Sequence, residues 1–207
     1  MGKRKRYKKI PIYDSDDKCI GYEILEKDIK IIECNKSDAD SIIKEHHYSH
    51  KVTKNSFVSL LVYYKNKISG ALQCGYGIRP KIKGEYDASQ VREFDRMWLS
   101  DEMPKYSETI VLSLFHKYMR LAHPEVKVLI SYADTSVGNN GTIYKAANYE
   151  LVDSLKMDFY ILPSGERVHP VTMWHWHKTR AWKFLTEKYP GIKHIREGRQ
   201  LKFVKYL

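Results

Sequence analysis

The chain has 207 residues, of which 43% are hydrophobic and 13% aromatic, and its formal net charge is +11. This length suits one domain of ordinary size, and the apolar content excludes a disordered or fibrous protein. No apolar run reaches the roughly 18 to 20 residues that span a bilayer, and no signal-type apolar segment follows the basic start of the chain. We therefore expect a soluble, cytoplasmic protein that has no membrane partner.

The positive charge is concentrated at both ends of the chain. Residues 1–9 contain six basic and no acidic residues, residues 178–207 contain nine basic and two acidic residues, and the stretch between them carries about −2. This distribution favours a protein that grips a polyanion at its edges, with nucleic acid as the leading partner. The alternative interpretation is a solubilising tail and a solvated helix face.

The three cysteines, Cys19, Cys34 and Cys74, are scattered and never spaced as C-x-x-C. An odd number of separated cysteines indicates reduced thiols in a cytoplasm rather than disulfides. We interpret them as small, mostly buried residues, and none of them as a nucleophile.

The first half of the chain predicts a sheet with one helix. Residues 1–28 are expected to form a basic tail and an irregular or hairpin-like lead-in, with the ordered domain beginning near Ile29. Hydrophobic periodicity then predicts, in order, a strand over 28–34, a helix from Ser37 to about His47, and two hairpin strands over 57–64 and 68–76.

The second half alternates strands and helices. After a loop over 77–89 we expect a strand over 91–99, a helix over 107–122, strands over 126–132, 150–154 and 157–162 with a short helix at 142–148, and a last strand over 199–207. Ser107 is expected to cap the long helix, whose apolar face would comprise Ile110, Leu112, Leu114, Phe115, Tyr118 and Leu121. This order predicts a mixed α/β sheet in a core over 29–165, with a basic, aromatic extension over 166–207 packed on the same domain.

The stretch from Leu129 to Tyr149, LISYADTSVGNNGTIYKAANY, carries the strongest functional signal. Its apolar start predicts a buried strand, its glycines and asparagines a turn, and its last part a short helix. Asp134 would then lie at a strand tip where such a sheet opens a ligand crevice, and Tyr144 would project toward the same opening. Two groups able to move protons are expected to converge there, although an Asp that begins a turn and a tyrosine packed in the core are the plainer alternatives.

The motifs of this stretch resemble a known fold and a known family. G-T-I-Y-K-A-A-N-Y resembles the A-x-x-L-Y-x-x-x-G-F ending of the GNAT acyltransferase fold, and S-Y-A-D-T followed by G-T-I-Y-x-A-x-N-Y is similar to the phage Mom family. The resemblance extends from about Ile31 to Asp153. It implies a GNAT-like sheet with two splayed central strands, and an enzyme that converts adenine in DNA to an N6-carbamoylmethyl form, which protects phage DNA from restriction in the host cytoplasm.

The resemblance also implies roles for single residues. Asp134 would accept the proton that leaves the adenine amino group or help to hold a metal, and Tyr144 stands where GNAT enzymes keep the tyrosine that protonates a leaving thiolate. The H-Y motif of the Mom family corresponds to His47 and Tyr48, which places Tyr48 among the catalytic residues. Because activity in the family has been linked to iron, the resemblance implies His47, together with Asp134 or Tyr48, as iron ligands. Histidines at helix ends are also common as mere capping or solvent contacts.

The loop before the helix at Ser107 departs from the GNAT pattern. GNAT enzymes have R/Q-x-x-G-x-G/A there, so that backbone N–H groups hold the pyrophosphate of acetyl-CoA. This chain has S-D-E-M-P-K-Y-S-E-T, which contains no glycine and three carboxylates. Acetyl-CoA is therefore not favoured, the group donor stays unknown, and Arg96 and Ser107 are the residues expected to contact it. Arg92 and Arg96 alternate on one face of their strand, and they either bind an anion or join Glu93 and Asp95 in structural ion pairs.

Two groups of residues are expected to contact DNA: Lys3, Arg4, Lys5 and Arg6 in the tail, and Trp174, His175, Trp176 and Arg180 in the extension. Aromatic and basic side chains together stack an extruded base and hold phosphates. An enzyme crevice does not reach a base inside a duplex. The hypothesis therefore requires double-stranded DNA with a flipped adenine.

Two rival functions remain compatible with parts of the sequence. The first is a GNAT N-acyltransferase that uses acetyl-CoA on a protein, a tRNA or a small amine, and it would need the missing glycine loop. The second is a non-enzymatic nucleic-acid-binding protein with a vestigial pocket, in which Asp134→Ala would leave DNA affinity and biological activity intact. Neither the oligomeric state nor the DNA sequence context is encoded in a pattern that we can interpret.

Overall fold

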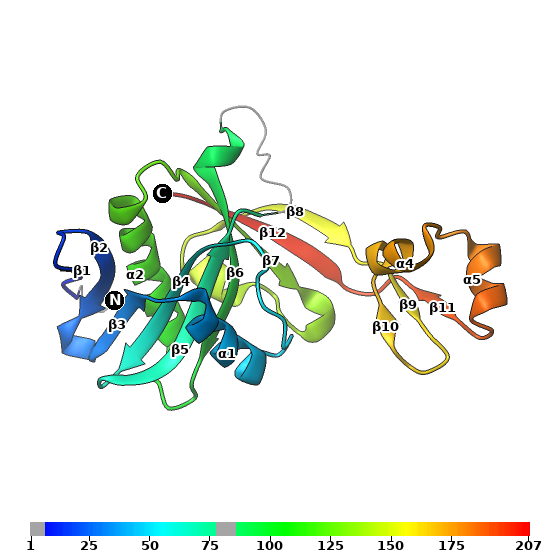
Figure 1. Cartoon of the computed structure of the whole chain (residues 1–207), viewed down its shortest axis with the longest axis horizontal. Helices are drawn as coiled ribbons and strands as arrows, with labels where there is room; N and C mark the ends of the chain where they lie inside the picture. Colours follow the sequence, from blue (N-terminus) through cyan, green and yellow to red (C-terminus); the bar gives the residue numbers. More distant parts are fainter. Residues whose placement is uncertain (1–6, 78–85) are drawn as a thin grey trace, which may run out of the picture. The chain divides into compact units, whose positions relative to one another are not determined.

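The computed structural model describes residues 7–77 and 86–207, which form two compact units (Figure 1). Of the described residues, unit 1 comprises 7–77, 86–132, 142–151 and 203–207, and unit 2 comprises 133–141 and 152–202. This division differs from the predicted boundaries at residues 28 and 165, because the chain leaves unit 1 after a central strand and returns to it twice.

Unit 1 is built on a large, mostly antiparallel sheet. Its strands are β1 (Ile10–Tyr13), β2 (Cys19–Ile24), β3 (Ile29–Glu33), β4 (Ser56–Tyr64), β5 (Lys67–Gly75), β6 (Val91–Leu99), β7 (Val128–Asp134) and the C-terminal half of β12 (Arg199–Tyr206), in that spatial order. Neighbours from β1 to β6 are antiparallel, whereas β6 and β7 are parallel. The predicted mixed α/β sheet is confirmed.

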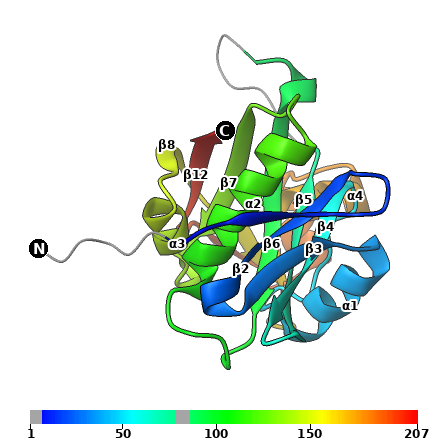
Figure 2. The ribbon, with the colours of Figure 1, turned by 90° about the vertical axis from the view of Figure 1, so that its left-hand side faces the viewer.

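Helices cover both faces of this sheet (Figure 2). They are α1 (Lys36–His46), α2 (Ser107–Ala122) and the short α3 (Thr142–Ala146), and unit 1 also contains the 3-10 turns η1 (Leu25–Lys27) and η2 (Ala88–Gln90). Ala39 and Ile43 of α1 pack on Leu61 and Ala71 of the β4–β5 hairpin, because a spacing of four residues puts both on one helix face. On the other helix, Phe115 packs against Phe94 of β6 at 5.2 Å between ring centroids.

The apolar face of α2 differs in part from its prediction. Val111 and Met119 are fully buried, whereas Leu121, which was assigned to that face, is 44% exposed. The helix N-cap is also one residue earlier than predicted, at Tyr106, which has φ of +72°. Ser107 is the first helical residue rather than the cap.

The predicted lead-in is an ordered part of the sheet. β1 and β2 form an antiparallel hairpin, and β2 pairs with β3. Gly21 permits the close approach of β2 and β3, since a Cβ at this position would lie 2.1 Å from the carbonyl oxygen of Ile31. The ordered domain therefore begins before Ile29, and residues 1–6 of the predicted tail lie outside the described residues.

The centre of the sheet opens between β6 and β7. These strands pair from Val91↔Val128 to Glu93↔Ile130, although both continue beyond those residues. Past that point the described strands share no ladder, which confirms the predicted splay. The β5–β6 ladder also shifts register between the pairs Gln73↔Arg96 and Cys74↔Phe94. Asp95 is therefore the extra residue of a β-bulge at the opening.

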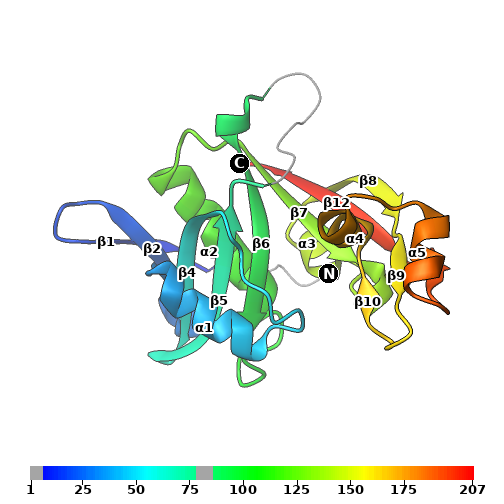
Figure 3. The ribbon, with the colours of Figure 1, turned by 45° about the vertical axis from the view of Figure 1, so that its right-hand side comes forward.

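Unit 2 is a small α+β unit (Figure 3). It contains the antiparallel strands β10 (Arg167–Val168), β9 (Phe159–Ile161) and β11 (Lys193–Ile195), the helices α4 (Pro170–His177) and α5 (Trp182–Lys188), the 3-10 turn η3 (Thr135–Val137), and most of β8 (Glu150–Lys156) beside the first half of β12. Its core consists of Tyr160, Leu162, Val168, Met173, Leu185 and Ile192. The predicted strand over 157–162 thus joins a separate three-stranded sheet instead of completing the large one, while the last strand is confirmed.

In the described part of the chain, no helix is long and apolar enough to cross a membrane. The three cysteines are free, with Cys19 and Cys74 buried and Cys34 half-buried. Burial raises the pKa of the Cys34 thiol to about 11 and that of Cys74 well above its usual value. None of these thiols is a ready nucleophile, as the sequence predicted.

Candidate functional site

A pair of carboxyl groups, Glu93 and Asp95, lies at the opening of the sheet in unit 1. Asp95 is largely buried and hydrogen-bonded to Glu93, and its Oδ2 atom has no hydrogen-bond partner among the described residues. Burial, followed by the charge of Glu93, raises the pKa of Asp95 to about 7. A carboxyl group with a pKa near neutrality is suited to accept a proton at physiological pH.

Two glycines leave room for this carboxyl pair. A Cβ at Gly75 would lie 2.5 Å from Oδ2 of Asp95, and a Cβ at Gly77 would lie 3.1 Å from Oε2 of Glu93. Gly77 also has φ of +74°, a conformation that favours glycine. The end of β5 is thus shaped to admit the two acids.

The segment that follows α1 brings His47 and Tyr48 to the same region. His47 is buried, its Nδ1 lies 2.8 Å from Oγ of Ser49, and its ring centroid lies 4.3 Å from that of Tyr48. Burial, and then the charges of Arg96 and His50, lower the pKa of His47 to about 4, so the imidazole is neutral at pH 7. Tyr48 is 62% exposed, which leaves its phenol accessible to a substrate.

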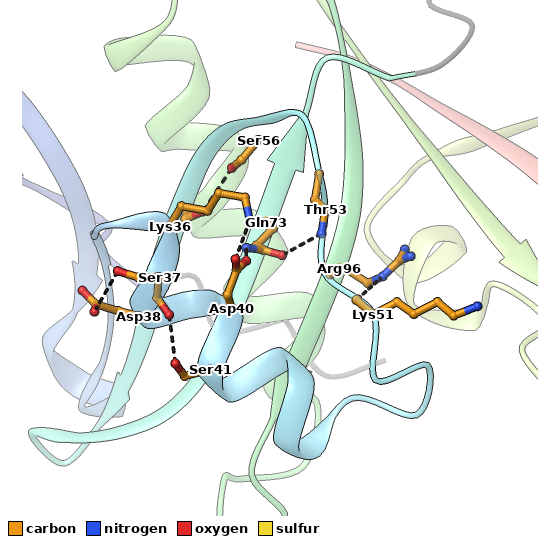
Figure 4. A network of polar contacts seen from close by, with 11 residues as sticks. Lys36, Ser37, Asp38, Asp40, Ser41, Lys51, Thr53, Ser56, Gln73 and Arg96 are labelled. Atoms are coloured by element: carbon orange, nitrogen blue, oxygen red, sulfur yellow. Dashed lines mark hydrogen bonds and ion pairs between the residues drawn. The ribbon is translucent and has the colours of Figure 1, made fainter.

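Polar contacts fix this segment on the sheet (Figure 4). Gln73 of β5 donates from Nε2 to Oδ1 of Asp40 at 2.7 Å, and its Oε1 accepts from the backbone N–H of Thr53 at 3.5 Å. Arg96 of β6 donates from Nε to the carbonyl oxygen of Lys51 at 3.2 Å. Helix α1, the segment and the central strands therefore form one connected network.

Arg92 and Arg96 do not share a strand face, contrary to the prediction, because the bulge at Asp95 reverses the alternation of side chains. The Arg92 guanidinium lies 4.3 Å from the ring centroid of Phe57 and 4.7 Å from that of Tyr76, and Nη1 donates to backbone carbonyls. Arg92 is a buried structural cation. The positive charge of Arg96 acts on both His47 and Tyr144.

Tyr144 lies on α3 and is buried. Its ring centroid is 6.4 Å from that of Phe94 and 5.3 Å from that of Phe203, and its hydroxyl group is hydrogen-bonded to Ser131. Burial raises the pKa of Tyr144 to about 12, so the phenol keeps its proton at neutral pH. The charges of Tyr48, Arg96 and Asp95, which all belong to unit 1, also act on the Tyr144 phenol.

Asp134 belongs to unit 2 and caps a turn. Its Oδ1 accepts hydrogen bonds from the backbone N–H of Ser136 at 2.8 Å and from the Ser136 hydroxyl at 2.5 Å, at the start of η3. This is the plainer role considered for an Asp at this position. Its convergence with Tyr144 of unit 1 stays a prediction.

Ser107 has a structural environment. It is 2% exposed, and its hydroxyl donates to the carbonyl oxygen of Pro104 at 2.6 Å. These contacts favour a role in shaping the turn before α2 over contact with a group donor.

Iron binding by His47 and Asp134 stays a prediction. Among residues 7–77 and 86–207, no group of three or more His, Cys, Asp or Glu side chains is arranged to hold a metal ion. Non-haem iron sites in proteins commonly use two histidines and a carboxylate. The described donors do not supply such a set, and no step below is routed through a metal.

The aromatic residues predicted to contact DNA lie on α4 in unit 2. Trp174 and Trp176 are each 49% exposed, and His175 and Arg180 are also exposed. Trp182 of α5 is 48% exposed. Large exposed aromatic side chains with neighbouring cations mark an interaction surface. The other predicted DNA contacts, Lys3 to Arg6, lie outside the described residues.

Sequence reasoning assigned Glu93 and Asp95 only to possible ion pairs. The sequence signal for a site here was the strand over 91–99, which carries four charged residues among apolar ones. Charged side chains in a strand need either a charged partner or contact with solvent. The bulge at Asp95 could not be predicted from the sequence, because the register of a strand depends on the strand with which it pairs.

His116 of α2 provides a stability prediction. Burial, and then Lys205, Arg120 and Lys9, lower its pKa to about 3. The unfolded chain therefore binds this proton more tightly than the folded one, and stability falls as the pH drops from about 6.5. We expect acidification from pH 7 to pH 4.5 to cost about 2 kcal/mol through this residue, and His116→Gln to remove that part of the loss. Urea unfolding of the wild type and the variant at both pH values measures this loss of unfolding free energy. If the variant loses as much stability as the wild type between pH 7 and pH 4.5, the assignment to His116 is contradicted.

The sheet with splayed central strands and helices on both faces defines the class of protein. It is similar to the ribosomal-protein-S5-alanine acetyltransferase from Vibrio fischeri, with a TM-score of 0.51 and 11% identity over 90% of this chain and 96% of that chain. It is also similar to RimL, a ribosomal L7/L12 alpha-N-protein acetyltransferase in complex with coenzyme A, with a TM-score of 0.51 and 8% identity over 86% and 94% of the chains. These likenesses show the GNAT acetyltransferase fold.

The family follows from sequence. The model of the Mom protein family matches residues 28–207. The methylcarbamoylase Mom of Escherichia phage Mu is 33% identical over 180 residues, which is 84% of this chain and 73% of that protein. The chain belongs to the Mom protein family. The match includes the C-terminal third, which the sequence motifs alone did not cover.

Proposed function

We propose that this protein is a transferase that places a carbamoylmethyl group on the N6 amine of adenine in DNA and thereby protects phage DNA from restriction. The observation that supports it most is the 33% identity to the methylcarbamoylase of phage Mu over 180 residues. The GNAT fold supports a group-transfer reaction in general.

The reaction makes clear demands on the site. A bond forms between N6 and the donated carbon, the donor loses its leaving group, and N6 gives up one proton. The N6 lone pair is delocalised into the purine ring, so removal of that proton helps the attack. A base with a pKa near 7 and a donor of a proton to the leaving group are the parts needed.

We assign these roles to unit 1. Asp95, with its pKa raised to about 7, is the proposed base, and it adds to the residues assigned from sequence. Tyr144, protonated at neutral pH, is the proposed acid for the leaving group. Tyr48 is proposed to contact the flipped adenine from its exposed position, and Arg96 to contact the donor. Asp134 remains a proposed catalytic residue through the family motif.

Mass spectrometry of nucleosides tests this function. Plasmid DNA from Escherichia cells that express the protein is expected to contain a heavier deoxyadenosine, whose mass shift identifies the transferred group. Asp134→Asn is the matched variant, because the amide oxygen preserves the cap on Ser136 while the charge is lost. If Asp134 acts chemically the modification disappears, and if it only caps the turn the modification persists.

The phage Mu methylcarbamoylase, expressed in the same cells, controls for the supply of the donor. Unmodified DNA from cells with a folded, soluble protein, beside modified DNA from the control, would contradict the proposal. A GNAT acyltransferase acting on another amine would then be the better reading, and calorimetry with coenzyme A would test it.

A further inference from the structure

A cavity of about 320 Å³ in unit 1, between α2, α3 and β12, is surrounded by cations. Its lining includes Lys9, Lys117, Arg120 and Lys205, and none of the described residues that line it is acidic. The cavity runs along one side of α2 from Thr109 to Arg120. None of the proposed catalytic residues lines it, although Ala146, Ala147 and Asn148 of its wall belong to the G-T-I-Y-K-A-A-N-Y motif.

The four cations come from three distant parts of the chain. Lys117 and Arg120 are three residues apart on α2 and therefore project from one helix face. Lys9 precedes β1 and donates to Oγ of Ser113 on the same helix. Lys205 of β12 donates to the carbonyl oxygen of Asn148 at 3.1 Å. The fold thus gathers four positive charges at one hollow.

These charges oppose one another in the protein alone. Burial, and then Lys117 and Arg120, lower the pKa of Lys9, and burial followed by Arg120 lowers the pKa of Lys205. In residues 7–77 and 86–207, none of the four forms an ion pair with a carboxylate. A concave site lined by one sign of charge focuses its field and attracts counter-ions.

We propose that this cavity binds phosphate groups. Phosphate oxygens accept charge-assisted hydrogen bonds from ammonium groups, and the planar guanidinium of Arg120 offers two parallel donors. Ser113 and Thr109 add hydroxyl groups to the lining. The phosphates come either from the backbone of a nucleic acid or from a small phosphorylated molecule. The proposal does not require the reaction described above, because its test measures binding.

The test compares two double variants that lose the same charge. Lys117→Ala/Arg120→Ala removes two exposed side chains of the cavity, and Lys44→Ala/Lys67→Ala removes two exposed lysines elsewhere in unit 1. Calorimetry with pyrophosphate and fluorescence anisotropy with a short duplex DNA, each over a range of salt, provide the readouts. Urea unfolding checks that the variants stay folded, and we expect the cavity variant to be at least as stable as wild type.

Each source of phosphate gives its own result. For a nucleic-acid backbone, the slope of log affinity for DNA against log salt is expected to fall by about 2 in the cavity variant, and not in a control whose lysines lie outside the interface. For a small phosphorylated molecule, pyrophosphate affinity is expected to fall about 10-fold or more while the DNA slope matches that of the control. If the two double variants behave alike with both probes, the proposal is overturned.

Discussion

Replacement of Asp95 by Asn is expected to reduce the rate of DNA modification by about 10²-fold or more, since general-base catalysis contributes roughly this factor. The amide keeps the size of the side chain in the bulge and cannot accept the proton at neutral pH. Wild-type activity is expected to rise with pH through about 7, as Asp95 ionises, and the variant is expected to lack this rise. Quantitative mass spectrometry of modified deoxyadenosine measures both the loss of rate and its pH dependence. The assays cover pH 5.5 to pH 8.5, a range of about one to two pH units on either side of the Asp95 pKa.

The free energy of unfolding of the Asp95→Asn variant separates a chemical role of Asp95 from a structural one. A raised carboxyl pKa means that the folded state binds the proton more tightly than the unfolded state, so the contribution to stability falls as pH rises from about 4 to about 7. Asp95→Asn is therefore expected to raise the free energy of unfolding at pH 8 by about 1 to 3 kcal/mol. A variant that is more stable and still fully active would exclude Asp95 as the base.

Gly75→Ala tests the same pocket from its other side. The added methyl group would meet Oδ2 of Asp95 and the carbonyl oxygen of Asn55, which a Cβ would approach to 2.5 Å and 2.7 Å. It therefore displaces the carboxyl group without changing its charge. If Asp95 is the base, its position matters, and this variant should lose activity in the same assay.

The elements that sequence predicted well are those with long, regular periodicity. The β4–β5 hairpin follows from two β-rich runs around a polar link, and α2 follows from apolar residues at helical spacing. The burial of individual residues at the edge of the apolar face of α2 was predicted less accurately than the helix itself. Leu121 is 44% exposed and Met119 is fully buried, because the side of α2 that is buried is decided by β2, β3 and α3, which pack against it.

Other features depend on partners that the local sequence does not name. The run from Phe159 to Ile161 was predicted correctly as a strand, but only the fold decides that it pairs with β10 and β11. Ile10 to Tyr13 contains a proline and is short, so its place at the sheet edge was not apparent. The bulge at Asp95 likewise depends on Gln73 and Cys74 of the neighbouring strand.

This dependence also explains the mixed outcome for the candidate site. The sequence identified His47, Tyr48 and Tyr144 through a family motif, and the structure places them with Arg96 in unit 1. A motif carries no information on burial. The carboxyl group with the pKa near 7 therefore became visible only once its surroundings were known.

The second prediction concerns DNA affinity and the exposed tryptophans of α4, Trp174 and Trp176. Trp174→Ala/Trp176→Ala is expected to weaken binding to DNA that contains an unpaired adenine by about 100-fold, because stacking on one base is worth roughly 1 to 3 kcal/mol. Neither side chain belongs to the core of unit 2, so the variant should stay folded. Fluorescence anisotropy with labelled DNA provides the measurement. Val171→Ala is the matched control, since Val171 is 51% exposed on the same helix and has no aromatic ring.

The salt dependence distinguishes stacking from charge. Loss of a stacking contact lowers affinity by a similar factor at every salt concentration, whereas loss of a phosphate contact changes the slope of log affinity against log salt. The tryptophan variant should therefore keep the wild-type slope, unlike a variant that removes basic phosphate contacts. It should also lose more affinity for DNA with an unpaired base than for an intact duplex, because only the former offers an open base face without the cost of flipping. Equal affinities of the tryptophan and valine variants for both DNAs would place the nucleic-acid contacts elsewhere on the protein.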